Sequence, residues 1–133
     1  MNMTEIQSSK TAILYAREPE NIDLPSMDRQ VESMIDWCVS NDAGVARIFA
    51  DDEPINSIGY DEAMGFIALN SPDVLLMWSA GAVIRERDYM DLQGFCKEYG
   101  CVIRYVSSGV EPEGEVGELL AYMDFLNTQN AIR

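Results

Sequence analysis

Four short apolar segments alternate with four longer amphipathic segments along the chain, and this alternation limits the folds that the chain can adopt. Each apolar segment has five or six residues, and the first and third are almost continuously apolar, as is typical of strands buried on both faces of a parallel sheet. The apolar segments are Thr11–Ala16, Val45–Ala50, Val74–Trp78 and Cys101–Val106. Their order predicts a single α/β domain with a mainly parallel sheet of four or five strands flanked by helices.

The amphipathic segments carry signals for helix starts and ends. We expect one helix that Ser26 caps and that runs to about Val39, because serine accepts backbone hydrogen bonds at such starts. The other expected helices cover Tyr60–Leu69, Arg85–Tyr99 and Val116–Ala131. The core-facing positions of the second are Met64, Ile67 and Ala68. Gly100 fits the left-handed end of the third helix, and the fourth is a C-terminal amphipathic helix.

A length of 133 residues suits one domain, which we place at residues 11–133 behind a flexible lead-in at residues 1–10. No apolar run approaches the roughly 18 residues of a membrane span, and the N-terminus lacks the apolar core of a signal peptide. We therefore expect a cytoplasmic protein that does not associate with membranes. The spacing of Cys38, Cys96 and Cys101 matches no zinc or redox motif, so we expect buried, reduced thiols.

The charged residues argue against several functions. The chain has no histidine, which excludes Ser-His and Cys-His catalysis and removes the commonest nitrogen ligand of zinc. Nine Lys and Arg stand against 23 Asp and Glu, which gives a net charge of −14. Because affinity for DNA comes largely from cations that neutralise phosphates, and the arginines here are scattered along the sequence, we expect no direct DNA binding. We also expect no cofactor and no bound metal.

Five segments in series resemble the catalytic domain of resolvase-type and invertase-type serine recombinases. The segments are AILYAR (Ala12–Arg17), RQVESM (Arg29–Met34), RIFADD (Arg47–Asp52), SPDVLLMW (Ser71–Trp78) and EPEGEVGELLAYM (Glu111–Met123). The resemblance spans nearly the whole chain and implies a resolvase-like fold. It also implies a mechanism in which a serine attacks a DNA phosphodiester and forms a phosphoserine link to the 5′ end. Arginines would stabilise the charge of the transition state without a metal.

The positions that this chemistry requires are mostly changed. Arg17 matches the arginine at the end of the first strand, but Pro19 stands where the nucleophilic serine should be. Gly81 and Ala82 replace the paired Asp and Arg that follow the third strand, while Arg85 stands where the next arginine would be. Glu118 reverses the charge of a further arginine. We therefore expect no catalytic residue to remain, and the chain to be unable to cleave DNA.

The first functional hypothesis is a protein-interaction or regulatory module. Recombinases of this type dimerise through their fourth helix, and the matching helix here carries apolar residues on more than one face. The interface candidates are Leu119, Tyr122, Met123 and Leu126. They either complete the core of the monomer or bind a protein, which would be a second copy, a recombinase or another basic protein. The resemblance family adds a helix-turn-helix domain, and we expect none here, since the sequence stops at Arg133.

Three alternatives remain open. The acidity could mimic DNA toward a nucleic-acid-binding protein, with its densest acids at Asp51, Asp52, Glu53, Glu111, Glu113, Glu115 and Glu118. Solvated loop charge is the simpler explanation of the same acids. The chain could be an unrelated enzyme in which Asp51 and Asp52 hold Mg²⁺ at a strand end. It could also be the catalytic fragment of an active site-specific recombinase.

Overall fold

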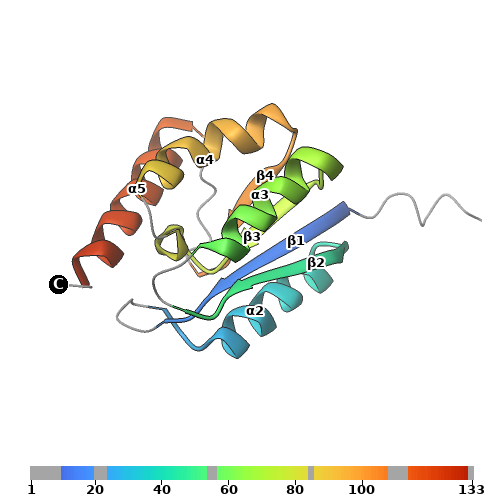
Figure 1. The fold of residues 1–133 in the computed structure, drawn as a ribbon, viewed down its shortest axis with the longest axis horizontal. Coiled ribbons are helices and arrows are strands. Elements are labelled where there is room, and N and C mark those ends of the chain that lie inside the picture. The colour runs from blue at the N-terminus through green and yellow to red at the C-terminus, as the bar shows by residue number, and fades with distance from the viewer. Residues whose placement is uncertain (1–9, 20–23, 54–56, 84–85, 108–113, 132–133) are drawn as a thin grey trace, which may run out of the picture.

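The computed structural model describes residues 10–19, 24–53, 57–83, 86–107 and 114–131, with the elements arranged as in Figure 1. The strands are β1 (Lys10–Arg17), β2 (Ala43–Asp51), β3 (Val74–Met77) and β4 (Val102–Tyr105). The helices are α2 (Met27–Ser40), α3 (Ile58–Asn70), α4 (Glu86–Glu98), α5 (Gly114–Ala131) and the short 3-10 helix η1 (Ala80–Ala82). The predicted order of strands and helices is confirmed.

The strands form one sheet in the order β2-β1-β3-β4, and every pairing is parallel. β1 lies in the middle and pairs with β2 along its whole length, from Lys10 opposite Ala43 to Arg17 opposite Asp51. A four-stranded parallel sheet in a single α/β domain is therefore confirmed. The register also sets Arg17 beside Asp51 at the carboxyl edge of the sheet, where the strands end.

Helices cover both faces of the sheet, and Figure 1 shows α2 on one side with α3, α4 and α5 on the other. The side chains of β1 alternate between two apolar cores accordingly. Ala12, Leu14 and Ala16 pack on α2, whereas Ile13 and Tyr15 face the other core. Burial on both faces explains the continuous apolar run of this strand.

The predicted helix ends agree with the structure at two positions. Ser26 caps α2, since its Oγ accepts a hydrogen bond from Arg29 N at 3.2 Å. Gly100 has φ +71°, and beyond it Cys101 N donates to Cys96 O at 2.8 Å, which closes α4. The three cysteines are free and buried, as expected.

Two details, at Lys10 and Ala68, differ from the sequence predictions. Lys10 begins β1 instead of ending a lead-in, because its N–H donates to Asp42 O at 3.2 Å; residues 1–9 lie outside the described part. Ala68 is exposed, and Ala63 and Ile67 are the α3 residues that lie fully buried in the core. β2 is largely exposed because it is an edge strand. Among the helices that the structure describes, none is long and apolar enough to cross a lipid bilayer.

Gly59 lets the start of α3 approach the end of β2. A Cβ atom added there would lie 2.3 Å from Ala50 O and 2.7 Å from Ala50 C. Such a contact is with backbone atoms, which cannot rotate away as a flexible side chain would. The close approach matters because it brings the first turn of α3 onto Asp51.

Gly59→Ala should therefore lower the free energy of unfolding by about 2 kcal/mol or more, because overpacking forces the backbone to move. Urea denaturation followed by circular dichroism measures this loss. Gly65→Ala in the same helix is the control: its Cβ meets nothing within 4 Å, and alanine favours a helix over glycine by up to about 1 kcal/mol. Equal stability of the two variants would contradict the close packing at Gly59.

Candidate functional site

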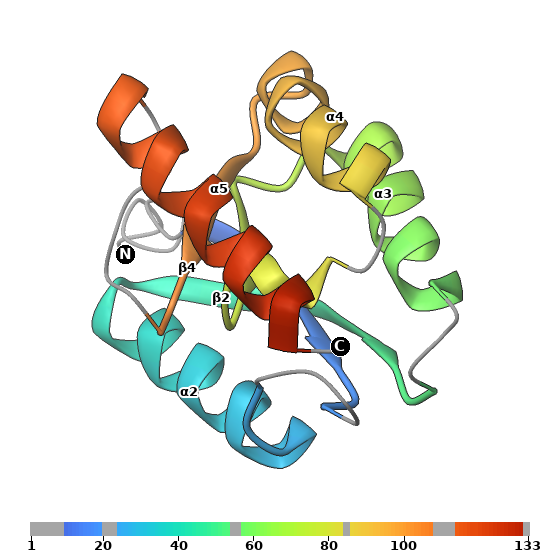
Figure 2. The same ribbon diagram turned by 90° about the vertical axis from the view of Figure 1, so that its left-hand side faces the viewer.

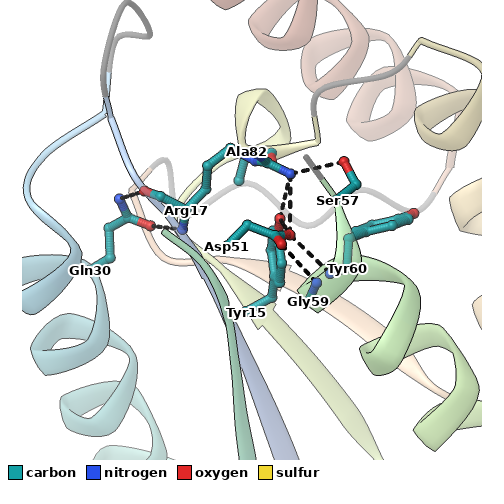
Figure 3. Close-up of polar contacts among 8 residues, drawn as sticks. All are labelled: Tyr15, Arg17, Gln30, Asp51, Ser57, Gly59, Tyr60 and Ala82. Carbon is teal, nitrogen blue, oxygen red and sulfur yellow. Dashed lines mark hydrogen bonds and ion pairs between the residues drawn. The ribbon is translucent and has the colours of Figure 1, made fainter. Parts of the chain in front are cut away.

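At the carboxyl edge of the sheet, polar side chains and backbone groups from several elements gather around Arg17 (Figure 3). Ligands of open α/β sheets bind at this edge, so it is the natural place to look for an active site. Arg17 ends β1 and Asp51 ends β2, directly opposite it in the register. Ser57 precedes α3, and Ala82 lies in η1, which follows β3. The parallel topology thus brings together residues that are far apart in the sequence.

The guanidinium of Arg17 is fully buried and contacts protein groups in several directions. Its Nη2 lies 3.4 Å from Asp51 Oδ2, and it donates to the hydroxyl of Tyr15 at 2.6 Å and to Ser57 Oγ at 3.2 Å. Its Nε donates to the carbonyl oxygen of Ala82 at 2.8 Å. In this arrangement the Arg17 guanidinium has no exposed surface, and protein groups occupy the directions in which it donates hydrogen bonds.

Asp51 links the strands to the first turn of α3. Its Oδ1 accepts a hydrogen bond from Gly59 N at 2.7 Å, and its Oδ2 accepts from Tyr60 N at 3.0 Å and from the Tyr15 hydroxyl at 2.5 Å. Free N–H groups and the helix dipole favour a carboxylate at this end of a helix. Ser57, the residue before the helix, makes no side-chain capping bond there, so Asp51 supplies the cap from a neighbouring strand.

Tyr15 bridges the two charged groups and remains protonated. Burial raises the pKa of its hydroxyl well above the ordinary value; the positive charge of Arg17 opposes the rise, and the hydrogen bond and charge of Asp51 add to it. The hydroxyl therefore keeps its proton at neutral pH and can donate it to Asp51 while accepting from Arg17.

Gln30 fixes the backbone at the end of β1. Its Oε1 accepts from Arg17 N at 3.1 Å, and its Nε2 donates to Arg17 O at 2.8 Å and to Pro25 O at 2.9 Å. The side chain is completely buried, in helical register with Met34 and Cys38 on the inner face of α2. The sequence contains a signal for this role of Gln30, because it places a glutamine at a core-facing position of an amphipathic helix. A buried amide needs hydrogen-bond partners, so such a glutamine is expected to bind nearby polar groups.

Of the positions expected to be degenerate, Ala82 contacts this cluster through its backbone carbonyl. Pro19 is half-buried two residues after Arg17, and Gly81 and Ala82 are buried within η1. Arg85, the second retained arginine, lies outside the described residues. The sequence did not predict a role for Ser57, whose hydroxyl oxygen accepts a hydrogen bond from the Arg17 guanidinium.

The structure corrects the expectation for Asp51 as a member of an acidic surface. Its side chain is only 2% exposed, because the ion pair and the start of α3 enclose it. Asp52, the next residue, is exposed, whereas both carboxylate oxygens of Asp51 already accept hydrogen bonds from protein groups. Within the described part of the chain, no three His, Cys, Asp or Glu side chains lie close enough to hold a metal ion.

The other acidic candidates are dispersed. Asp52 and Glu53 are exposed after β2, and Glu118 is exposed on α5. Glu115 belongs to α5, but its side chain is outside the described part, as are residues Glu111 and Glu113. The described acids therefore belong to separate elements, and an acidic surface that mimics DNA stays a prediction.

The interface candidates all lie on α5. Leu119, Met123 and Leu126 are exposed, whereas Tyr122 is half-buried and its ring stacks on Tyr89 of α4 at 6.0 Å between centroids. Three of the four thus do not complete the core of the monomer. The core positions of this helix are instead Ala121 and Phe125.

Asp51→Asn should destabilise the domain by about 3–5 kcal/mol, because removing one partner leaves the buried Arg17 charge uncompensated. Chemical denaturation measures the change. Asp52→Asn removes the same charge from an exposed neighbour and should change stability by no more than about 0.5 kcal/mol. If both variants unfolded at the same denaturant concentration, the ion pair would not stabilise the fold.

Neither protein-family models nor curated proteins match the sequence. Solved structures do match the fold, among them the N-terminal catalytic domain of TP901-1 integrase, with a TM-score of 0.67 and 14% identity over 91% of this chain and 96% of that one. A resolvase family site-specific recombinase from Streptococcus pneumoniae matches with a TM-score of 0.68 and 16% identity over 92% of both chains. The C-terminal catalytic domain of an IS607-like serine recombinase, ISC1926 TnpA, matches with a TM-score of 0.60 and 16% identity over 90% of this chain and 82% of that one. This chain has the resolvase-like fold of serine-recombinase catalytic domains.

Proposed function

We propose that this domain does not cleave DNA and acts as a protein-interaction module that regulates a recombinase or another DNA-binding protein. The observation that carries the proposal is the outward face of α5, where large apolar side chains remain exposed. The closed cluster around Arg17 supports the inference that the domain does not cleave DNA. A catalytic fragment of an active recombinase would have the same fold, so the two functions must be separated by experiment.

Loss of cleavage is inferred from the chemistry of the cluster. Proline has neither a hydroxyl nor a thiol, so Pro19 cannot form a covalent bond to phosphate. The guanidinium of Arg17 binds Asp51 and lies out of solvent, so a DNA phosphate could reach it only if the ion pair opened. Opening a buried pair of this kind costs several kcal/mol. Gly81 and Ala82 add no charge that would stabilise a transition state.

The outward face of α5 is an apolar stripe that the domain does not use. Its members are between 37% and 70% exposed: Val116, Leu119, Leu120, Met123 and Leu126. Their spacing of three and four residues places them along one side of the helix. Ala121 and Phe125, on the roughly opposite side, bury the helix against the core. Figure 2 shows α5 in front of the other elements, on the outside of the domain.

An apolar stripe of this kind is typical of a protein interface, because contiguous exposed apolar surface favours association. Spacing of three and four residues also suits helix-to-helix packing. The charged residues of α5 are all acidic, namely Glu115, Glu118 and Asp124. Electrostatic repulsion between these acidic residues would therefore oppose the association of two copies through the stripe. A basic partner would instead be attracted by the same residues.

The first test is incubation of the purified protein with supercoiled plasmid that carries candidate recombination sites, followed by denaturing electrophoresis. We expect neither nicking nor a covalent protein–DNA adduct. An adduct would refute the proposal and favour an active catalytic fragment. Ser57 would then be the first residue to examine, since its hydroxyl contacts Arg17, and Ser57→Ala would be expected to remove the adduct.

The second test measures self-association by light scattering at low and high salt. Because salt screens repulsion between acidic helices but not apolar contact, we expect dimers to become more abundant as salt rises. Leu119→Asp combined with Met123→Asp should yield a monomer. Leu69→Asp, on an exposed leucine of α3, should leave dimerisation unchanged. Dimers that persist in the double variant would place the interface elsewhere.

A further inference from the structure

A small cavity lies between α4 and α5 and is distinct from the cluster around Arg17. Its volume is about 190 Å³, and β4 contributes Tyr105 to its wall. Tyr89 and Gln93 of α4 and Glu118 and Tyr122 of α5 also line it. Pockets for drug-sized ligands occupy about 300–1,000 Å³. The cavity is therefore too small for such a ligand, and its size suits a single side chain.

Aromatic rings form much of the cavity wall. The ring of Tyr89 stacks on Phe125 at 4.6 Å between centroids and an interplanar angle of 10°, and on Tyr122 at 6.0 Å and 24°. The rings are thus nearly parallel and hold one another in position across α4 and α5. The face of an aromatic ring carries partial negative charge and attracts a cation placed over it.

Carboxylates add to the negative potential of the cavity. Glu118 is exposed and lines the wall, so it stands on the solvent side. Burial raises the pKa of Tyr89 to about 12, and the negative charges of Asp124 and Glu118 contribute to the rise. The Tyr89 hydroxyl is therefore neutral, and two carboxylates act on it. Among the described residues lining this cavity there is no lysine or arginine; Lys97 lines an adjoining hollow, which shares Gln93 and Glu118 with the cavity.

We propose that this cavity receives the side chain of an arginine from a basic protein partner, which rests on the proposed function as a protein-interaction module. A guanidinium is flat, so it can lie against the aromatic wall that Tyr89 and Tyr122 form while its edge donates to a carboxylate. Glu118 supplies that carboxylate, and the Gln93 side chain offers a further oxygen. A lysine ammonium carries the same charge but lacks the flat face and the fork of donors.

Nuclear magnetic resonance titration of the ¹⁵N-labelled protein tests this site with three short peptides. The probes are acetyl-Gly-Arg-Gly-amide, the same peptide with citrulline, which is a neutral isostere of arginine, and the same peptide with lysine. We expect the arginine peptide to shift the amide signals of residues around Tyr89, Glu118 and Tyr122. The citrulline peptide should not shift them, and the lysine peptide should bind more weakly.

Two variants and a control define the site further. Glu118→Gln should weaken binding of the arginine peptide about fivefold, which is the upper range for an exposed ion pair. Tyr122→Leu keeps an apolar side chain but removes a ring, and it should weaken binding as well. Glu62→Gln removes the same charge from an exposed position on α3 and should leave binding unchanged.

The result that would overturn the site is the absence of arginine-dependent shifts around the cavity at millimolar peptide, or equal shifts with citrulline. An equal effect of Glu118→Gln and Glu62→Gln would show attraction by net charge alone and would also overturn it. Failure here is distinguishable from failure of the proposed function. Light scattering reports on the Leu119 and Met123 stripe, whereas the titration reports on the cavity behind it.

Discussion

The buried ion pair between Arg17 and Asp51 is the interaction on which the carboxyl edge of this domain depends. Removing a guanidinium and a carboxylate from water costs several kcal/mol for each ion, and their attraction offsets that cost only when further hydrogen bonds satisfy both groups. Tyr15, Ser57, the Ala82 carbonyl and the first turn of α3 supply those bonds. The pair therefore joins two strands, a helix and η1 into one unit, and Arg17 can stabilise the fold without taking part in chemistry.

The same unit supports the surface where we place the function. η1 accepts the hydrogen bond from Arg17 through Ala82, and α5 packs directly on η1. The 3-10 helix η1 thus connects α5 with the cluster around Arg17. On its outward side α5 carries the apolar stripe, and toward α4 it lines the aromatic cavity with Glu118 and Tyr122. The buried cluster around Arg17 and the exposed apolar face of α5 thus lie on connected parts of the fold.

Sequence patterns predicted the elements well because their signals are local. The apolar run of β1, the Ser26 cap and Gly100 are each read within a few neighbouring residues, and all three agree with the structure. The candidate site was harder to predict. Asp51 lies 36 residues from Tyr15 in the sequence, and Ser57 lies 40 from Arg17, so no local pattern joins them. The acid therefore looked like part of a charged surface, whereas the parallel register buries it beside Arg17.

The sequence by itself determined the order of strands and helices, because local apolar patterns carry it, and the absence of histidine, because composition decides it. Only the tertiary structure decided which groups face water. Burial depends on the pairing of distant strands and on the side of a helix that meets the sheet. That pairing encloses Arg17 and Asp51, and the docking of α5 through Ala121 and Phe125 leaves its second apolar face exposed.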